Sequence, residues 1–143
     1  AYGPEMRGGT ANCSVIVSDE EIASPLCNEP DVLVAMNAPS FHKFAPRVKK
    51  GGVILVNVSL SDDHAGRDDV SLYEIAANDI AMEEGDVRSA NSVMLGALCG
   101  VTGLIQDRSV VSCLQEKFIG KPKVLEINEK AFAAGKAAVA KKK

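Results

Sequence analysis

The first residues of the chain carry the densest group of side chains that could contact a ligand. The opening segment, residues 2–13, reads YGPEMRGGTANC and places Glu5 and Arg7 among three glycines and one proline. The Arg7 guanidinium is a planar fork that fits a carboxylate or a phosphate, and the glycines let another backbone approach closely. The glycine spacing matches no phosphate-binding fingerprint. The segment is therefore either an anion-contacting loop or an ordinary connection with a solvated Glu5–Arg7 pair.

Asparagines supply the second group of candidate ligand contacts, and they are Asn12, Asn37, Asn57 and Asn91. Asn37 and Asn57 each follow a short apolar run, at the carboxyl ends of predicted strands, which is where open parallel sheets bind ligands. The alternative for Asn37 is a helix cap, and the alternative for Asn57 is a bond to its own loop. Ser89 and Asn91 stand at the head of an apolar helical pattern, where an anion site and ordinary capping are both consistent with the sequence.

The residue pattern predicts neither a metal centre nor a catalytic constellation. The cysteines lie far apart in sequence and form no C-x-x-C pair, and neither histidine is near a cysteine. The cysteines are Cys13, Cys27, Cys99 and Cys113, and the histidines are His42 and His64. Residues 62–64 read as a solvated loop, and no Ser–His–Asp order, HExxH or Walker motif occurs. We therefore expect no catalytic residue, no metal and no cofactor bound by this chain alone, with Cys99 and Cys113 as buried free thiols.

The composition narrows the class of protein. The chain has 143 residues, a net charge of −3, 46% hydrophobic residues and 4% aromatic residues, so we expect one domain over residues 1–143 and no nucleic-acid partner. The basic run Lys141–Lys143 is expected to be a disordered tail. The apolar stretch Val93–Ile105 has 13 residues, fewer than the about 20 that span a bilayer, so we expect no membrane association. Cysteine usage favours a reducing, cytoplasmic location.

Hydrophobic runs and helical periodicity predict an α/β fold. Strands are expected at residues 13–18, 31–36, 53–58 and 71–75. Helices are expected at residues 40–48, 77–84, 91–105, 109–118 and 128–140. Strands that alternate with helices indicate a Rossmann-like, open, mainly parallel sheet flanked by helices. Only four strands are supplied, so another segment or a partner chain should cover the exposed edge.

The apolar helix predicted at residues 91–105 carries glycines at close spacing. Gly96, Gly100 and Gly103 lie among Leu, Val and Met side chains. Small residues at that spacing let another element pack close to the helix backbone. This pattern indicates either a buried core helix or a subunit interface, including a homodimer contact.

Several of these segments together resemble a known family. The chain reads YGPEMRGGTANCSVIVSDEEI, PDVLVAMNAPSFHKF, GGVILVNVSL, ANSVMLGALCG and EKF…NEKAFAAG, and nearly its whole length resembles the gamma subunit of 2-oxoacid:ferredoxin oxidoreductases. Members of that family begin with a glycine-rich strand–turn–helix unit. The resemblance therefore implies that this sequence is truncated at its N-terminus.

The resemblance implies a role within a multi-subunit enzyme. Such enzymes convert a 2-oxoacid and coenzyme A to an acyl-CoA, carbon dioxide and reduced ferredoxin. Thiamine diphosphate, magnesium and iron–sulfur clusters are expected in partner subunits, with alpha, beta and delta subunits as partners and ferredoxin as the acceptor of the complex. The opening loop, Tyr2, Gly3, Pro4, Glu5, Met6, Arg7, Gly8 and Gly9, would face substrate, coenzyme or those subunits.

The amino-acid sequence of the opening loop most resembles that of gamma subunits from 2-oxoglutarate enzymes. Glu5-Met6-Arg7-Gly8-Gly9 differs from pyruvate-type gamma subunits, which tend to have a second arginine in place of Met6. The expected reaction is therefore that of 2-oxoglutarate synthase, with succinyl-CoA as product and with the isolated chain inactive. A pyruvate or branched-chain enzyme remains an alternative, as does a stand-alone Rossmann-like module that binds a nucleotide.

Overall fold

Three parallel strands form the centre of the protein, in the spatial order β1-β2-β3. The computed structural model describes residues 12–24, 26–59 and 67–140. Strand β1 covers Val32–Ala35, β2 covers Val53–Asn57 and β3 covers Ser71–Ile75. In register, Val53 of β2 pairs with Val32 on one side and with Ser71 on the other. The predicted α/β fold with an open parallel sheet is confirmed.

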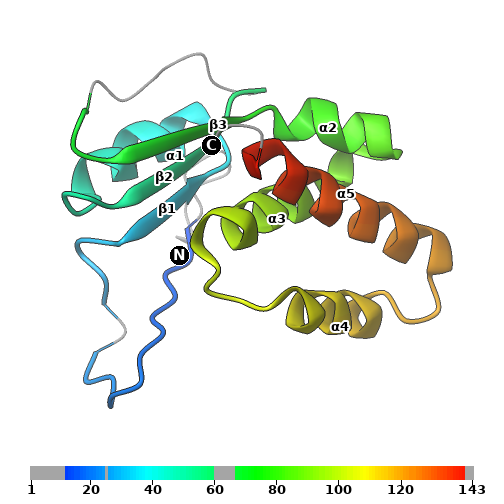
Figure 1. The fold of residues 1–143 in the computed structure, drawn as a ribbon, viewed down its shortest axis with the longest axis horizontal. Coiled ribbons are helices and arrows are strands. Elements are labelled where there is room, and N and C mark those ends of the chain that lie inside the picture. The colour runs from blue at the N-terminus through cyan, green and yellow to red at the C-terminus, as the bar shows by residue number, and fades with distance from the viewer. Residues whose placement is uncertain (1–11, 25, 60–66, 141–143) are drawn as a thin grey trace, which may run out of the picture.

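Helices cover both faces of this sheet (Figure 1). Their bounds are α1 Ala38–Phe44, α2 Ala77–Glu84, α3 Ala90–Thr102, α4 Asp107–Lys117 and α5 Pro122–Ala140, with 3-10 turns η1 at Ala45–Arg47 and η2 at Val87–Ser89. Helix α1 lies on one face, whereas α3 and α5 lie on the other. Helix α4 is peripheral and packs against the outer side of α3 and α5.

The central strand β2 shows why the layers form. Its side chains alternate between the two faces, as the pleat of a strand requires. Ile54 and Val56 pack with the α1 layer, and Leu55 packs with the α3–α5 layer. All three are fully buried, which explains the continuous apolar run in the sequence, since a parallel strand with both faces covered has no solvent side.

Two helices end earlier than the hydrophobic periodicity of the sequence predicted, one because of a proline and the other because of a glycine. The helix predicted to run to Val48 changes to a 3-10 turn after Phe44, because Pro46 has no N–H to continue the α-helical ladder. Helix α3 was predicted to reach Ile105 but ends at Thr102, where Gly103 takes φ +64°. Glycine enters that left-handed conformation without steric cost, so it terminates the helix.

The glycines of α3 are used inside the chain. A Cβ on Gly96 would lie 2.0 Å from the Phe132 carbonyl oxygen of α5, and a Cβ on Gly135 would lie 1.9 Å from the Val93 carbonyl oxygen of α3. The two backbones therefore touch at this crossing, and no side chain fits between them. The core-helix interpretation is confirmed for Gly96, while Gly103 serves as the helix end.

One predicted strand is absent. Residues 13–18 have no regular secondary structure, and Val15 and Val17 are 76% and 80% exposed. β-branched side chains favour a pleated, half-buried surface, but here no neighbouring strand supplies one. The prediction of a strand at residues 13–18 was therefore wrong for this structure, and the described part of the sheet has three strands instead of four.

Two further expectations need correction. Helix α5 begins at Pro122, six residues before the predicted start at Asn128, because proline is well suited to the first turn of a helix. Cys99 is buried as expected, and burial raises the pKa of its thiol. Cys113 is exposed, and it lies outside the buried cluster that holds Val110 and Leu114 of the same helix.

Candidate functional site

The carboxyl edge of the sheet is organised around the amide of Asn57. This residue ends β2 and is fully buried. Its Nδ2 donates to the Met36 carbonyl oxygen at 3.3 Å and to Asn78 Oδ1 at 2.9 Å. Its Oδ1 accepts from the backbone N–H groups of Ser59 at 3.2 Å and Ala77 at 3.1 Å. One side chain thus joins the end of β1, the loop after β2 and the start of α2.

Helix α2 receives its N-terminal caps from the same strand end. Its own N-cap position, Ala76, has no side chain that can accept a hydrogen bond. Asn57 accepts from the N–H of Ala77, and Ser59 Oγ accepts from the N–H of Asp79 at 3.4 Å. These contacts satisfy N–H groups that otherwise lack partners at a helix start. Sequence reading missed this role, because the caps come from residues about 20 positions away.

The structure separates the four candidate asparagines. Asn37 accepts a hydrogen bond from the Ser40 N–H at 3.0 Å and caps α1, as the alternative interpretation predicted. Asn57 is buried and its amide is used within the chain, so we assign it to the architecture of this edge. Asn12 is exposed in an irregular segment, whereas Asn91 is exposed at the start of α3. No two of Asn12, Asn37 and Asn91 are joined by a described contact.

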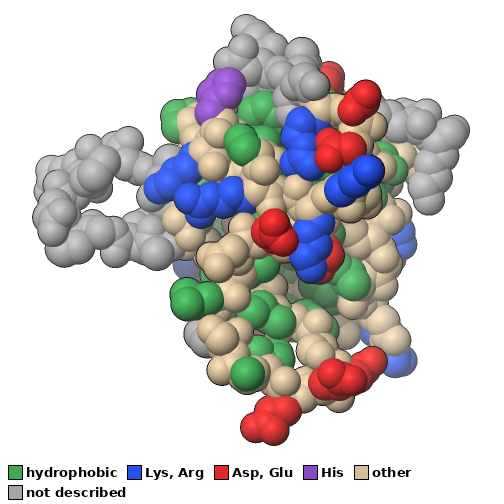
Figure 2. All heavy atoms as spheres, turned by 90° about the vertical axis from the view of Figure 1, so that its left-hand side faces the viewer, with side chains coloured by type: hydrophobic (Ala, Val, Ile, Leu, Met, Phe, Trp, Pro, Cys, Tyr) green, Lys and Arg blue, Asp and Glu red, His purple; other side chains and the backbone are tan. Residues whose placement is uncertain are grey.

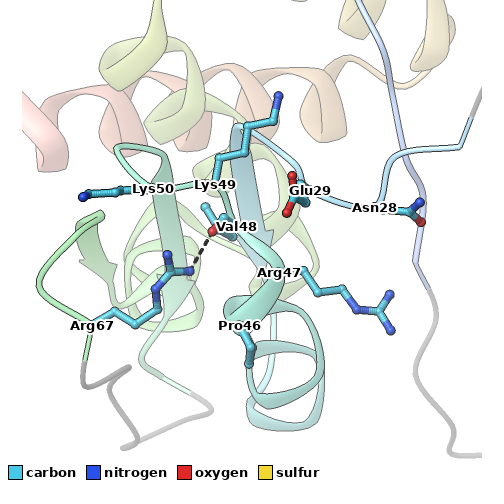
Figure 3. A pocket seen from close by; sticks show the side chains of 8 residues that line it. All are labelled: Asn28, Glu29, Pro46, Arg47, Val48, Lys49, Lys50 and Arg67. Atoms are coloured by element: carbon cyan, nitrogen blue, oxygen red, sulfur yellow. Dashed lines mark hydrogen bonds between the residues drawn. The ribbon is translucent and has the colours of Figure 1, made fainter.

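The opposite, amino edge of the sheet carries a groove of about 760 Å³. Its walls come from the segment before β1, from η1 and the turn that follows it, and from the segment before β3. They are lined by Asn28, Glu29, Pro46, Arg47, Val48, Lys49, Lys50 and Arg67 (Figure 3). The positive side chains point apart: Lys49, Lys50 and Arg47 diverge in this view. No single small anion can contact all of them, so the groove is not a convergent anion site.

Arg67 has a structural role in this groove. Its Nη1 donates to the carbonyl oxygens of Ala45 at 3.0 Å and Val48 at 2.8 Å. Its Nε and Nη2 bind both carboxylate oxygens of Asp69, at 2.8 and 2.7 Å. These side-chain hydrogen bonds lower the pKa of Asp69 and raise the pKa of Arg67. Arg67 therefore fastens the end of η1 to the segment that leads into β3.

The face around the groove is mixed in charge. Figure 2 shows Lys and Arg side chains interspersed with Asp and Glu on this side of the molecule. Lys49 pairs with Asp31 at 3.6 Å, and Arg67 pairs with Asp69 at 2.7 Å. A surface of this kind is typical of a solvated or protein-contacting face and unlike a nucleic-acid footprint, which is predominantly basic.

A second, smaller cavity lies at the head of α3 and includes Asn91. Its volume is about 300 Å³, and it is lined by Asp86, Arg88, Ser89, Asn91, Lys117, Phe118, Lys121, Val124, Ile127 and Asn128. Ser89 and Asn91 were expected at a helix head that serves either as an anion site or as a cap. The structure places both in a cavity wall. The lysines and the phenylalanine of the α4–α5 corner were not expected there.

Other expectations concern what the chain does not carry. In the described ranges, no group of three or more His, Cys, Asp or Glu side chains is arranged to hold a metal ion. Across the same part of the chain, every helix is too short or too polar to cross a lipid bilayer. The opening loop, residues 2–9, lies outside the described residues, as do residues 62–64 and the tail at residues 141–143.

Comparison with known proteins defines the family. Residues 1–138 match the family described as Pyruvate ferredoxin/flavodoxin oxidoreductase. The chain belongs to this family. The match covers the opening loop and the described elements from β1 to α5, the last of these up to residue 138.

Relatives within the family are named for different 2-oxoacids. The chain is 41% identical over 137 residues to "Ketoisovalerate oxidoreductase subunit VorA" of Methanothermobacter marburgensis, which covers 94% of this chain and 28% of that protein. It is 40% identical over 112 residues to "2-oxoglutarate synthase subunit KorC" of Methanocaldococcus jannaschii, covering 77% of this chain and 60% of that protein. The chain thus spans only part of both relatives.

Solved structures share the fold. A 2-oxoglutarate:ferredoxin oxidoreductase from Magnetococcus marinus, with 2-oxoglutarate, coenzyme A and succinyl-CoA bound, is 28% identical and matches with a TM-score of 0.73, over 87% of this chain and 22% of that chain. The gamma subunit of a keto/oxoacid ferredoxin oxidoreductase from Geobacter sulfurreducens matches with a TM-score of 0.71 at 24% identity, over 78% of this chain and 64% of that one. The second likeness concerns the fold alone.

Proposed function

We propose that this chain is the gamma component of a multi-subunit 2-oxoacid:ferredoxin oxidoreductase and completes an active site that partner subunits carry. The observation that supports this most is the family match over residues 1–138 together with similarity to separately named subunits such as KorC. In this proposal, thiamine diphosphate, magnesium and iron–sulfur clusters belong to the alpha, beta and delta partners. Coenzyme A is the co-substrate and ferredoxin is the electron acceptor.

The chemistry of the described residues supports a noncatalytic role. The polar groups at the carboxyl edge of the sheet hydrogen-bond within the chain, with Asn57 as their centre. A protein of this kind contributes shape and hydrogen bonding to a shared site, and the reacting groups come from the partners.

The substrate we propose is 2-oxoglutarate, which is converted with coenzyme A to succinyl-CoA and carbon dioxide. It is supported by the sequence of the opening loop and by the 2-oxoglutarate synthase relatives. A branched-chain 2-oxoacid is the second candidate, favoured by 41% identity to the ketoisovalerate subunit over 94% of this chain. The two substrates differ in chemistry, because 2-oxoglutarate carries a second carboxylate and a branched-chain 2-oxoacid carries an apolar group in that position.

We assign to Arg7 the contact with an anionic group of the substrate or of coenzyme A. Arginine binds carboxylates and phosphates through paired hydrogen bonds, and such charge-assisted bonds are about twice as strong as neutral ones. The neighbouring Gly8 and Gly9 would let the loop backbone approach that group closely. Within this proposal, Tyr2–Gly9 form one wall of a site that the partner subunits complete.

The subunit proposal is tested by reconstitution. The full-length protein is produced together with its alpha, beta and delta partners, and coenzyme A-dependent reduction of a viologen dye is measured with 2-oxoglutarate, ketoisovalerate and pyruvate. We expect activity only when all partners and this protein are present, with the highest kcat/KM for 2-oxoglutarate. Full activity without this protein would contradict the subunit role. A higher kcat/KM for ketoisovalerate than for 2-oxoglutarate would contradict the proposed substrate and favour a branched-chain 2-oxoacid.

The role of Arg7 is tested in the same complex. Arg7→Ala should raise the KM of either coenzyme A or the 2-oxoacid by roughly tenfold or more, and the affected substrate identifies the anion that Arg7 contacts. The matched control is Arg108→Ala, which removes an exposed arginine at the start of α4. Equal kinetics in the Arg7→Ala complex and the wild type would exclude the contact. If the protein alone binds a nucleotide and no partner, the stand-alone module is favoured instead.

A further inference from the structure

The cavity at the head of α3 combines an unbalanced positive charge with an apolar wall. Its polar side is formed by η2, the first turn of α3 and the α4–α5 corner, and its apolar side by Phe118, Val124 and Ile127. The volume of about 300 Å³ lies at the lower end of the range for small-molecule sites. Such sites are typically apolar cavities with a few fixed polar groups, which is the composition found here.

The charge of the cavity remains positive after its own ion pair is counted. Asp86 is the one acidic residue in the lining, and both of its carboxylate oxygens are bound by Arg88, from Nη2 at 2.7 Å, from Nε at 2.9 Å and from the backbone N–H at 2.8 Å. Lys117 and Lys121 form no ion pair within the described part of the chain. These two ammonium groups have no acidic partner among the lining residues.

The backbone of the α4–α5 corner holds both lysines beside the cavity. Gly120 takes φ +78°, a conformation that glycine adopts without strain. The Lys121 N–H donates to the Phe118 carbonyl oxygen at 2.9 Å, and the Lys121 carbonyl accepts from the Leu125 N–H at 3.0 Å. The Lys117 ammonium lies 5.6 Å from the centroid of the Phe118 ring. The corner is thus fixed before any ligand arrives, which reduces the entropic cost of binding.

The start of α3 adds to the positive potential. Ser89 stands at the N-cap position, yet its hydroxyl donates to the Asp86 carbonyl oxygen at 2.7 Å and caps no helical N–H. The first turn of α3 contains no acidic residue. The neutral Asn91 side chain accepts from the Ser92 N–H at 2.9 Å, and no acidic side chain of this first turn offsets the positive end of the helix dipole.

The floor of the cavity is closed by satisfied polar groups. Asn128 is buried, accepts from Ser92 Oγ at 2.6 Å and donates to the Val124 carbonyl oxygen at 2.8 Å. Ser89 is also buried. Because these groups already have partners, they shape the cavity, and the cations of the lining that form no ion pair among the described residues are the exposed Lys117 and Lys121.

We infer that this cavity is a binding site for a small organic phosphate, in which Lys117 and Lys121 bind the phosphate group and Phe118, Val124 and Ile127 contact an attached apolar or aromatic group. Two ammonium groups and a helix start suit a dianion better than a singly charged carboxylate. The inference does not depend on the proposed 2-oxoacid chemistry, because none of the residues involved belongs to the opening loop.

The test uses calorimetric titration of the full-length protein with phenyl phosphate, which carries a dianion and an aromatic ring in one small molecule. We expect saturable binding that weakens with added salt, since charge pairs at a rim are screened. Inorganic phosphate should bind more weakly because it lacks the ring, benzoate more weakly because it carries a single charge, and phenol not at all. Absence of saturable binding of phenyl phosphate would overturn the site.

Variants locate the binding. The double variant Lys117→Gln/Lys121→Gln should weaken phenyl phosphate binding by at least about tenfold, whereas Lys123→Gln should change it less than about twofold. Lys123 is the matched control, because it is exposed in the first turn of α5 and does not line the cavity. Thermal unfolding without ligand checks that each variant is folded. The assignment would be overturned if the double variant bound phenyl phosphate as tightly as the wild type, or if Lys123→Gln lost as much affinity as the double variant. If inorganic phosphate bound as tightly as phenyl phosphate, the role of the apolar wall would be overturned.

Discussion

The two edges of the parallel sheet are held by different interactions, a neutral buried amide at the carboxyl edge and a charged, partly exposed guanidinium at the amino edge. At the carboxyl edge, the neutral, fully buried amide of Asn57 joins three segments through hydrogen bonds to Met36, Ser59, Ala77 and Asn78. At the amino edge, the charged and partly exposed guanidinium of Arg67 joins the end of η1 to the segment that leads into β3. Each edge therefore depends on one side chain that reaches across about 20 residues of sequence.

The two edges differ in whether water can take the place of a hydrogen-bond partner that is lost. A buried polar group that loses its partner keeps the full cost of desolvation. A partly exposed group can turn to water instead, and its ion pair is screened by salt. We therefore expect the carboxyl edge to be costly to disturb and independent of pH in the acid range. The amino edge should be less costly to disturb and sensitive to acid.

The largest effect is expected for Asn57→Ala. The substitution removes the amide and leaves the N–H of Ala77 and the carbonyl of Met36 without their partner, which should lower the free energy of unfolding by about 3 kcal/mol or more. Urea unfolding followed by circular dichroism measures this change. A loss below about 1 kcal/mol would mean that water or the neighbouring Asn78 takes over the bonds.

A smaller loss of stability is expected for Arg67→Ala. The carbonyl oxygens of Ala45 and Val48 lose their donor, but the Arg67 side chain is partly exposed, so we expect water to take its place. The midpoint of urea unfolding should fall, by less than in the Asn57→Ala protein. Lys50→Ala is the control from the same groove and should leave the midpoint unchanged. A loss in Arg67→Ala as large as that in Asn57→Ala would contradict the proposed contrast between the edges.

Ser59→Ala sharpens the comparison within the carboxyl edge. Ser59 Oγ accepts from the Asp79 N–H at 3.4 Å and donates to Asp79 Oδ2 at 3.2 Å, both at an exposed position. Loss of a helix cap should lower the free energy of unfolding by about 0.5–1 kcal/mol. If Ser59→Ala matched Asn57→Ala, capping of α2 would account for the whole effect and burial of Asn57 for none of it.

The smallest effect is expected in how the free energy of unfolding depends on pH in acid. Hydrogen bonds from Arg67 and Arg88 lower the pKa values of Asp69 and Asp86, respectively. A lowered folded-state pKa stabilises the protein above the unfolded value of about 3.9 and loses that contribution as the pH falls through the folded value. Unfolding measured from pH 7 down to about pH 3 should show a decline that Arg67→Ala reduces. The difference between Asn57→Ala and wild type should stay constant over that range.

Local sequence determined most of the elements. Apolar runs predicted the strands that became β1 and β2, residues 71–75 were predicted as a shorter strand and form β3, and Asn37-Ala38-Pro39 predicted the start of α1. Residues 77–84 were predicted as a helix and form α2. These signals are reliable because they depend on neighbours within one or two turns of the chain.

The failures share a physical cause. Residues 13–18 have the composition of a strand, but a strand forms only against a partner, and none lies beside them in the described structure. The cavity at the head of α3 was foreseen only through Ser89 and Asn91. Lys117 and Lys121 reach it from another helix and a turn, and no spacing in the sequence relates them to α3.

The sequence by itself determined the family, the α/β class and the positions of helices and strands, since these follow from short-range patterns and from similarity along the chain. Only the tertiary structure decided that Asn57 closes the carboxyl edge, that Gly96 and Gly135 bring two backbones into contact, and that two lysines meet the start of α3. Those outcomes require segments far apart in sequence to meet at fixed distances, and the packing of the whole chain sets these distances.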